Sequence, residues 1–490
     1  MELSTVGRCL IGQAIGAARA AVAFLLVGAV WSATASPVAS ETLAQALADA
    51  YRSNPTIAAE RKQLEATDEE VPIAKSNYRP RVTLRGDVER RASRSRSTLN
   101  ATGGGVSSDS RTPGGYEIEF TNTLFRGFRN ANQLRQAEAN ILAARETLRE
   151  TEQQVLLDAV TAFMDVLRDR GIVRLRQNDV QVLSEEVRAT SIRFEAGDAT
   201  RTDVAQARAR RAGSLSALDL AKANLRSSAA QYRRLIGHQP GRLRKPALPN
   251  RLLPANIRQA IDVAQGEAPN VVRAAFQERS AQHEVDIVRG ELLPTVDLEA
   301  SYNSRFNSSE FNKQNDDASV GARVSIPLFQ GGGVYARIRA AKRRRERAAE
   351  QIEEARLAAR ATTVTAWSQY TAARAQLISV QAQVRSNQVA LDGVRAEERV
   401  GQRTLLDVLD AKQELLESQS NLLTTRRDIV VAAYSVLSSL GRLTAADIAL
   451  PVEQHDPEVY YGAVQDKIWG TTVVVNEDYD GYVIDGEVLK

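Results

Sequence analysis

Two very long helices are the first prediction of the hydrophobic pattern. Over residues 128–195 and 334–400, apolar side chains recur at intervals of three and four, and neither stretch contains a proline. At ~1.5 Å per residue, each helix would span on the order of 100 Å. A second helix follows each one after a turn, at 203–236 and 407–440. Because a lone helical hairpin cannot enclose an apolar stripe, we expect the hairpins to pack against each other and against other subunits.

Two pairs of strands are predicted where apolar and polar residues alternate strictly. The apolar positions are Val82, Leu84, Val88, Tyr116, Ile118 and Phe120 in the first pair, and Val296, Leu298, Ala300, Tyr302, Val320, Ala322, Val324 and Ile326 in the second. An exposed polar loop divides each pair, at 93–115 and 305–317. A helical segment precedes each pair, at about 43–77 and 257–291, and ends before a proline.

These elements belong to an internal repeat. Leu124-Phe125-x-Gly127 recurs as Leu328-Phe329-x-Gly331, an offset of 204 that also relates Gly197 to Gly401 and Gly237 to Gly441. Upstream the offset is 214, as between Pro80 and Pro294, so the first copy carries ten extra residues in its polar loop. The chain therefore divides into a first copy at 41–245, a second at 246–450, and a tail at 451–490. The tail has no repeat partner, and we assign no structure to it.

The first forty residues are typical of a signal peptide. Arg8 and Arg19 supply positive charge, an apolar run follows, and small residues allow cleavage after Ala35 or after Ser40. The only cysteine of the chain, Cys9, lies in this segment. The mature chain would therefore have no disulfide and no thiolate site.

Composition and charge argue against several functions. Aromatic residues make up 5% of the chain, and a net charge of +4 comes from charged residues of both signs, which form 25% of the chain. We therefore expect long helices rather than a nucleic-acid-binding protein. The three histidines, His238, His283 and His455, show no metal-ligand spacing, and Gly331–Gly333 lacks the Lys-Ser/Thr of a phosphate loop. We expect no enzymatic activity, no cofactor and no metal.

The four strands can be arranged in two ways. They can form a small sheet with its apolar face against helices, or they can enter a membrane with the apolar face toward lipid and the charged face toward water. The second arrangement explains Glu117, Glu119, Glu299 and Arg323 on the opposite face. A barrel in lipid has no open edges and needs at least about eight strands, so several chains would share one barrel.

The turns between the long helices carry a structural motif. Gly197 and Gly401 provide the left-handed residue at a helix end. Thr200-x-x-Asp203 and Thr404-x-x-Asp407 fit capping boxes at the start of the next helix. Capping is therefore a sufficient structural explanation for both aspartates.

Residues without a counterpart in the other copy are the candidates for function. At the offset of 204, Asp410 corresponds to Gln206, and Arg403 corresponds to Ala199. Asp407 and Asp410 are three residues apart and so share a helix face. We expect them to form a ring of carboxylates that binds cations at a pore constriction, with Arg403 available to close it by ion pairing. The alternative is a solvated helix start.

The sequence Gly401-x-Arg403-Thr404-x-x-Asp407-Val408-Leu409-Asp410-Ala411, together with the duplication, resembles the TolC family of outer-membrane channel-tunnels over about 41–450. The resemblance implies a mainly α fold with a membrane β-barrel portion: a homotrimer with a twelve-strand barrel on a periplasmic α-helical tunnel. It implies an exit duct for type I protein secretion or multidrug efflux. The tunnel would be opened at its tip by a periplasmic adaptor and an inner-membrane ABC or proton-driven transporter.

The resemblance also implies roles for individual residues. Arg403 would be a closing link, Asp407 and Asp410 the aspartate rings, and Asp203 a link partner on the neighbouring hairpin. Gly197, Gly401, Thr404 and Leu405 would form the hairpin tips where the adaptor docks. One position departs from the family pattern: a tyrosine bonded to the acid matching Asp203 is replaced by Glu398. Glu398 would repel Asp203 unless a cation or an arginine intervenes.

A periplasmic coiled-coil adaptor without a membrane barrel is the alternative function. Such a protein would lack the paired alternating strands and would be recovered without detergent. The transported substrate and the type of inner-membrane partner are not encoded in any motif that we can identify.

Overall fold

The computed structural model describes residues 40–97, 105–308 and 313–472. Apart from Ser40, the predicted signal peptide, with Cys9 and Ala35, lies outside the described residues. These form two compact units: one comprises residues 40–53, 158–249 and 373–431, and the other comprises 54–157, 250–372 and 432–472. Each unit combines segments of both sequence copies. The division into copies at 41–245 and 246–450 thus describes the repeat and stays a prediction.

The long helices form as the hydrophobic pattern predicts. Helix α5 (Arg129–Ala196) has 68 residues and α9 (Gly333–Arg399) has 67, and they are followed by α6 (Arg201–Ile236) and α10 (Leu405–Ser439). Their ends lie within two residues of the predicted ones. Many buried residues of α9 are spaced by seven positions, as at Ala359, Ala366, Ala373 and Val380, and an 11-residue step leads from Val380 to Leu391. Such a narrow stripe is typical of a coiled-coil seam and leaves the other helix faces exposed.

The helical segment before each strand pair is divided by a proline. Helix α2 (Leu43–Ser53) ends before α3 (Pro55–Asp68), which is followed by α4 (Glu70–Ser76); in the second copy α7 (Ile257–Glu267) precedes α8 (Pro269–Arg289) and the short 3-10 helix η1 (Gly290–Leu292). Both prolines occupy the first helical turn, where no N–H is needed. The side chain of Asn54 accepts the Thr56 N–H at 2.9 Å and starts α3. The sequence pattern did not predict these breaks.

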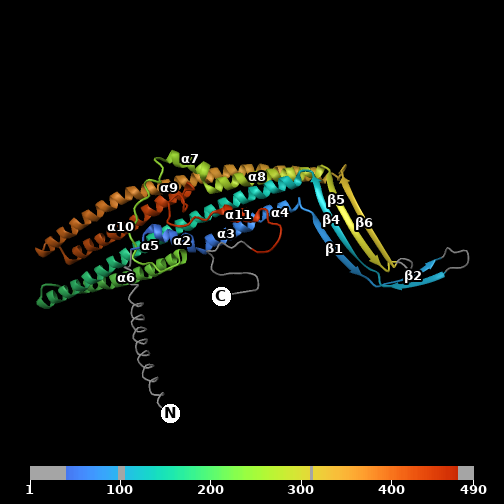
Figure 1. Ribbon diagram of the computed structural model, residues 1–490. Coiled ribbons are helices and arrows are strands. Elements are labelled where there is room, and N and C mark those ends of the chain that lie inside the picture. Colours follow the sequence, from blue (N-terminus) through green and yellow to red (C-terminus); the bar gives the residue numbers. More distant parts are fainter. Residues whose placement is uncertain (1–39, 98–104, 309–312, 473–490) are drawn as a thin grey trace, which may run out of the picture. The chain divides into compact units, whose positions relative to one another are not determined.

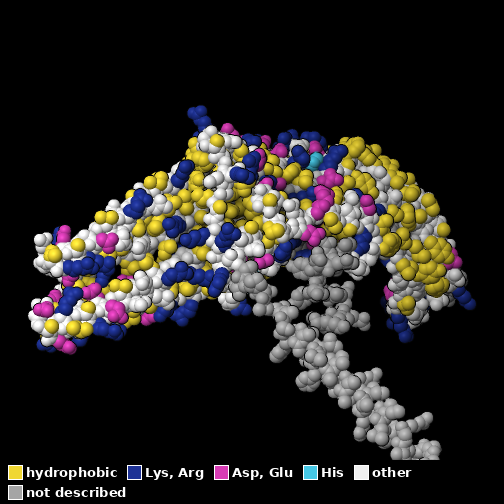
Figure 2. All heavy atoms as spheres, turned by 60° about the vertical axis from the view of Figure 1, so that its left-hand side comes forward, with side chains coloured by type: hydrophobic (Ala, Val, Ile, Leu, Met, Phe, Trp, Pro, Cys, Tyr) yellow, Lys and Arg dark blue, Asp and Glu magenta, His cyan; other side chains and the backbone are white. Residues whose placement is uncertain are grey.

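The predicted strand pairs form one four-stranded antiparallel sheet in the order β1-β4-β5-β6 (Figure 1), with bounds Arg81–Val88, Gly114–Arg126, Thr295–Phe306 and Gln314–Ser325. Val82, Phe120, Ala300 and Val320 form one apolar row across it. Val82 is 65% exposed and Val320 is 80% exposed. Figure 2 shows hydrophobic side chains gathered over these strands.

The opposite face of the sheet is polar and is cross-linked by ion pairs. Arg323 donates to both carboxylate oxygens of Glu299, at 2.8 and 2.7 Å, and Arg85 pairs with Glu119 at 2.9 Å. Both edge strands, β1 and β6, lack a further strand partner within the described residues. The sheet is therefore two-faced and open on both sides.

One predicted loop is partly wrong. Largely within 93–115, expected to be an exposed polar loop, the chain forms strands β2 (Arg91–Ser97) and β3 (Gly105–Arg111), which pair with each other as a separate two-stranded hairpin. Alternation of arginine and serine hid this hairpin, because neither of its faces is apolar. Among the helices of the described residues, none has both the length and the apolar character needed to cross a membrane.

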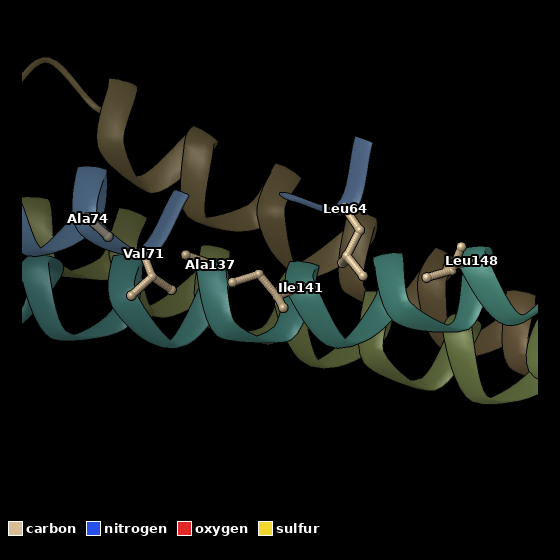
Figure 3. Close-up of a cluster of buried hydrophobic side chains, with 6 residues drawn as sticks. All are labelled: Leu64, Val71, Ala74, Ala137, Ile141 and Leu148. Atoms are coloured by element: carbon tan, nitrogen blue, oxygen red, sulfur yellow. The ribbon is translucent and has the colours of Figure 1, made fainter. Parts of the chain in front are cut away.

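Helix α5 packs on α3 and α4 within the unit that contains the sheet. Leu64, Val71 and Ala74 face Ala137, Ile141 and Leu148 of α5 (Figure 3). The first part of the tail joins this core as helix α11 (Pro457–Val464), whose Tyr461 packs against the same cluster. Tyr460 donates a hydrogen bond to Glu69 at 3.0 Å. The rest of the tail, residues 473–490, lies outside the described part of the chain.

Candidate functional site at the ends of the long hairpins

The α5–α6 and α9–α10 turns have the same backbone geometry. Gly197 has φ +87° and Gly401 has φ +78°, values that an L side chain rarely adopts. At the first turn, Gly197 N bonds to the carbonyl of Phe194 and Asp198 N to that of Arg193; the second turn repeats both bonds. This pair of backbone hydrogen bonds is the Schellman motif, which satisfies the last carbonyls of each long helix.

Both predicted capping boxes are present. The Thr200 amide donates to Asp203 Oδ2 at 2.8 Å, and the Asp203 amide donates back to Thr200 Oγ1 at 3.2 Å. Thr404 and Asp407 repeat this arrangement at 2.9 and 3.3 Å. Backbone and side-chain hydrogen bonds from each threonine lower the pKa of Asp203 and of Asp407 below the usual value. Both carboxylates are therefore ionised at neutral pH and start the second helix of their hairpin.

Glu398 is paired with an arginine of the other hairpin. Arg193 Nη1 donates to Glu398 Oε1 at 2.9 Å, which joins α5 to α9 one turn before the glycines. The sequence left open whether a cation or an arginine would intervene at Glu398, and Arg193 supplies the positive charge. No pattern had marked Arg193 as functional.

Two further ion pairs join the two hairpins farther from the turns. Lys412 Nζ donates to Glu186 Oε2 at 2.9 Å, and both side chains are largely buried, at 11% and 18% exposed. Arg210 of α6 donates to Asp410 and also to the Gln413 side chain on α10. Asp410 is thus held by a residue of its own chain, which offsets part of its charge.

The predicted closing arginine lies at the tip but pairs within its own hairpin. Arg403 Nε contacts Glu397 Oε2 at 3.0 Å. Among the described residues, Asp203 accepts hydrogen bonds from Thr200 rather than from Arg403. The structure thus brings Asp407, Asp410 and Arg403 to one end of α10, while any Arg403 link to Asp203 would have to form between chains.

Two grooves adjoin the hairpin ends. One of about 610 Å³ is lined by α5, α6 and α10, including Leu183, Arg210, Leu406 and Lys412. The other, of about 450 Å³, is lined by α5, α9 and α10, including Leu405. Leu405 and Leu406 therefore face different grooves, and Thr404 precedes both as an exposed cap.

Comparisons with known proteins match both sequence copies of the chain. The family model described as outer membrane efflux protein matches residues 46–238 and 260–442, two ranges whose starts are 214 apart and whose ends are 204 apart. The chain is 37% identical over 452 residues to "Outer membrane efflux protein BepC" of Brucella suis, covering 92% of this chain and 96% of the relative. It is 25% identical over 440 residues to "Outer membrane protein TolC" of Escherichia coli, covering 86% and 87%. The Campylobacter jejuni CmeC outer membrane channel matches with a TM-score of 0.71 at 15% identity, covering 86% and 89%.

Proposed function

The chain belongs to the outer membrane efflux protein family, and from that premise we propose that it is the outer-membrane exit duct of a three-component export system. It is an outer-membrane channel of the TolC type, and its function is transport rather than catalysis. The match of the family model to both copies carries this conclusion. The alternative, a coiled-coil adaptor without paired strands, does not agree with the four-stranded sheet.

A homotrimeric barrel would complete the sheet. Each chain contributes four strands with one exposed apolar face and two open edges, and three chains would supply the twelve strands of a closed barrel. Its apolar face would contact lipid, and the Arg323–Glu299 face would line the water-filled interior. Most of the helical part of the chain would then lie in the periplasm.

The exposed faces of α9 also support assembly with further copies. Leu357, Ile378 and Val389 are each at least 65% exposed and follow one another at intervals of 21 and 11 residues. On a straight helix, an 11-residue interval returns to within about 20° of the same direction and a 21-residue interval to within about 60°, so the three side chains lie on the same side of α9. A second apolar stripe beside the buried one is expected where a neighbouring chain completes a helical tunnel.

Asp407 and Asp410 would form the gate of that tunnel. The ionised, half-exposed Asp407 is suited to a ring of three carboxylates that attracts divalent cations. Asp410 contributes less, because Arg210 compensates it. Arg403 and Asp203 would link neighbouring hairpins, and Arg193–Glu398 would hold the two hairpins of one chain together.

A periplasmic adaptor and an inner-membrane ABC or proton-driven transporter would open this gate. The exposed tips at Gly197, Gly401 and Thr404, with Leu405 in the adjoining groove, would form the docking surface for the adaptor. The cargo would be small molecules for efflux or a protein for type I secretion. Crosslinking in cells from a photoreactive residue at Leu405 would identify the partners and hence the class of cargo.

Conductance in planar bilayers tests the gate. D407A/D410A should weaken block of the channel by divalent cations, whereas R210Q, which releases Asp410, should strengthen it. Unchanged block in both variants would refute the carboxylate ring. Recovery of the native protein in the periplasmic fraction without detergent would refute the membrane channel itself.

A further inference from the structure

Three potential metal ligands converge where the first hairpin meets the start of the described chain. His238 directly follows Gly237, the left-handed residue that ends α6. Glu41 lies two residues before α2, and Asp49 lies on that helix. The Glu41 amide donates to the Arg242 carbonyl at 2.7 Å, and the Arg244 amide donates to the Glu41 carbonyl at 2.8 Å. Glu41 is thereby fixed beside the residues that follow His238, and it lies after both expected cleavage positions.

The spacing of the ligand atoms fits a small divalent cation. His238 Nε2 is 3.5 Å from Glu41 Oε1 and 3.4 Å from Asp49 Oδ2, and the three ligand atoms all lie within 4.8 Å of one another. A tetrahedral ion with bonds of about 2.0–2.2 Å has ligand–ligand distances of about 3.3–3.6 Å. Among the residues that the structure describes, no other such group of three ligands occurs. Asp49 and His238 remain partly exposed, so an ion can enter.

Neighbouring groups hold two of the ligands in the form that a metal requires. His238 Nδ1 lies 3.0 Å from the Gln239 carbonyl, which accepts the Nδ1 proton and leaves Nε2 as the free lone pair. The fully buried Tyr232 donates its hydroxyl proton to Glu41. A carboxylate oxygen has two lone pairs, and the other remains available to a metal.

The charge balance also differs from that of the second copy. There Arg442 occupies the position of His238 and is neutralised by one carboxylate, Glu267, through bonds of 2.9 and 3.0 Å. In the first copy two carboxylates face a histidine. Arg52 lies 3.6 Å from the other carboxylate oxygen of Asp49, Oδ1. The first-copy pocket therefore places two carboxylates around one imidazole, whereas its counterpart pairs one carboxylate with one arginine.

We propose that Glu41, Asp49 and His238 bind a divalent transition-metal ion, best zinc, with a water molecule as the fourth ligand. One imidazole and two carboxylates are ligands that zinc accepts readily. The ion would tie the N-terminal end of the mature chain to the end of α6. This site is separate from the proposed gate and does not depend on the transport function.

Metal binding to the detergent-purified full-length protein tests the proposal. The protein is stripped with a chelator, loaded with zinc, passed through a desalting column and analysed for zinc per chain. The wild type should retain one zinc per chain. H238R, which reproduces the Arg442 arrangement and keeps the charge pairing, and the near-isosteric D49N should each weaken binding by at least about a hundredfold. Y232F, which keeps all ligands, should weaken it by about 10- to 100-fold.

Two matched variants distinguish this site from others on the chain. H283Q removes a histidine elsewhere and should retain the zinc, and D407N/D410N should retain it as well. With cobalt, the wild type should show the intense visible bands of tetrahedral coordination, and H238R should lose them. Wild-type protein that elutes without zinc, or zinc retained equally by H238R and D49N, would overturn the proposal. Loss of zinc in D407N/D410N alone would assign the ion to the gate and would likewise overturn it.

Discussion

Replacing Glu398 by glutamine tests whether the Arg193–Glu398 pair holds the hairpins together. The two side chains meet at 2.9 Å, with 45% of Arg193 and 20% of Glu398 exposed. Glutamine keeps the shape of Glu398 and removes its charge. We expect E398Q to destabilise the closed arrangement of the hairpin ends, because Arg193 would lose its charged partner across the α5–α9 contact.

The structure limits the size of this effect. A partly exposed ion pair contributes about 0.5–1 kcal/mol, since solvent screens it. If three chains open together, the loss is about 1.5–3 kcal/mol, because the contact occurs once in each chain. At about 1.4 kcal/mol per factor of ten, the ratio of open to closed channels should rise roughly 10- to 150-fold. The difference from wild type should shrink at high salt, which weakens the pair.

Single-channel recording in planar bilayers measures this ratio. E185Q is the matched control, because it removes a glutamate from an exposed pair within α5, where Arg188 lies 3.6 Å away. E185Q should behave as the wild type, and R193E/E398R should restore closure by reversing the pair. If E398Q opened no more often than wild type, or E185Q opened equally often, the pair would not be the link that we infer.

Three further changes probe the scaffold. K412A leaves the largely buried Glu186 without its ion-pair partner and should lower the free energy of unfolding by on the order of 3 kcal/mol. K412M/E186Q removes both charges and should lower it much less. Thermal unfolding measures both variants. Burial raises the pKa of Asp68 from 3.8 to about 6, although Arg145 lowers it. Neutral Asp68 contributes to the free energy of unfolding, and this contribution is fully present below pH 3.8 and is lost as the pH rises through about 6. The uncharged D68N should therefore raise the Tm at pH 7.5 but not at pH 3.5. G127A should abolish assembly, because an added Cβ would overlap the Gly290 carbonyl and lie 2.9 Å from Leu293 Cβ. G331A meets open space and should cost only the strain of positive φ, about 1–2 kcal/mol; yields of assembled protein compare the two.

The helices and the sheet were predictable because each follows from a local pattern. Proline-free stretches and turn glycines determine the ends of α5, α6, α9 and α10, and alternation determines β1, β4, β5 and β6. The breaks before Pro55 and Pro269 were missed because proline in the first turn leaves the apolar periodicity intact. The β2–β3 hairpin was missed because neither of its faces is apolar, and α11 because it lies outside the repeat.

The candidate site was only partly predictable, for a physical reason. Capping by Thr200 and Thr404 depends on spacing along the chain and could be read directly. The partners Arg193, Arg210 and Glu186 depend on which faces of distant helices meet, and local spacing contains no such information. The metal ligands illustrate the same limit: Asp49 and His238 are nearly two hundred residues apart, so no spacing rule brings them together.

The three pairs that join the hairpins share an asymmetry that bears on how a ring of such chains would open. Their acids, Glu186, Glu398 and Asp410, correspond at the offset of 204 to Ala390, Phe194 and Gln206, which carry no charge. In a ring that alternates first and second hairpins, the contact between chains would place Ala390, Glu397 and Glu414 opposite Arg208, Phe194 and Gln206. None of these three combinations is an ion pair. The contact within a chain is therefore closed by charges that the contact between chains does not repeat. These pairs must break when the two hairpins of a chain separate, which is why E398Q should favour the open channel.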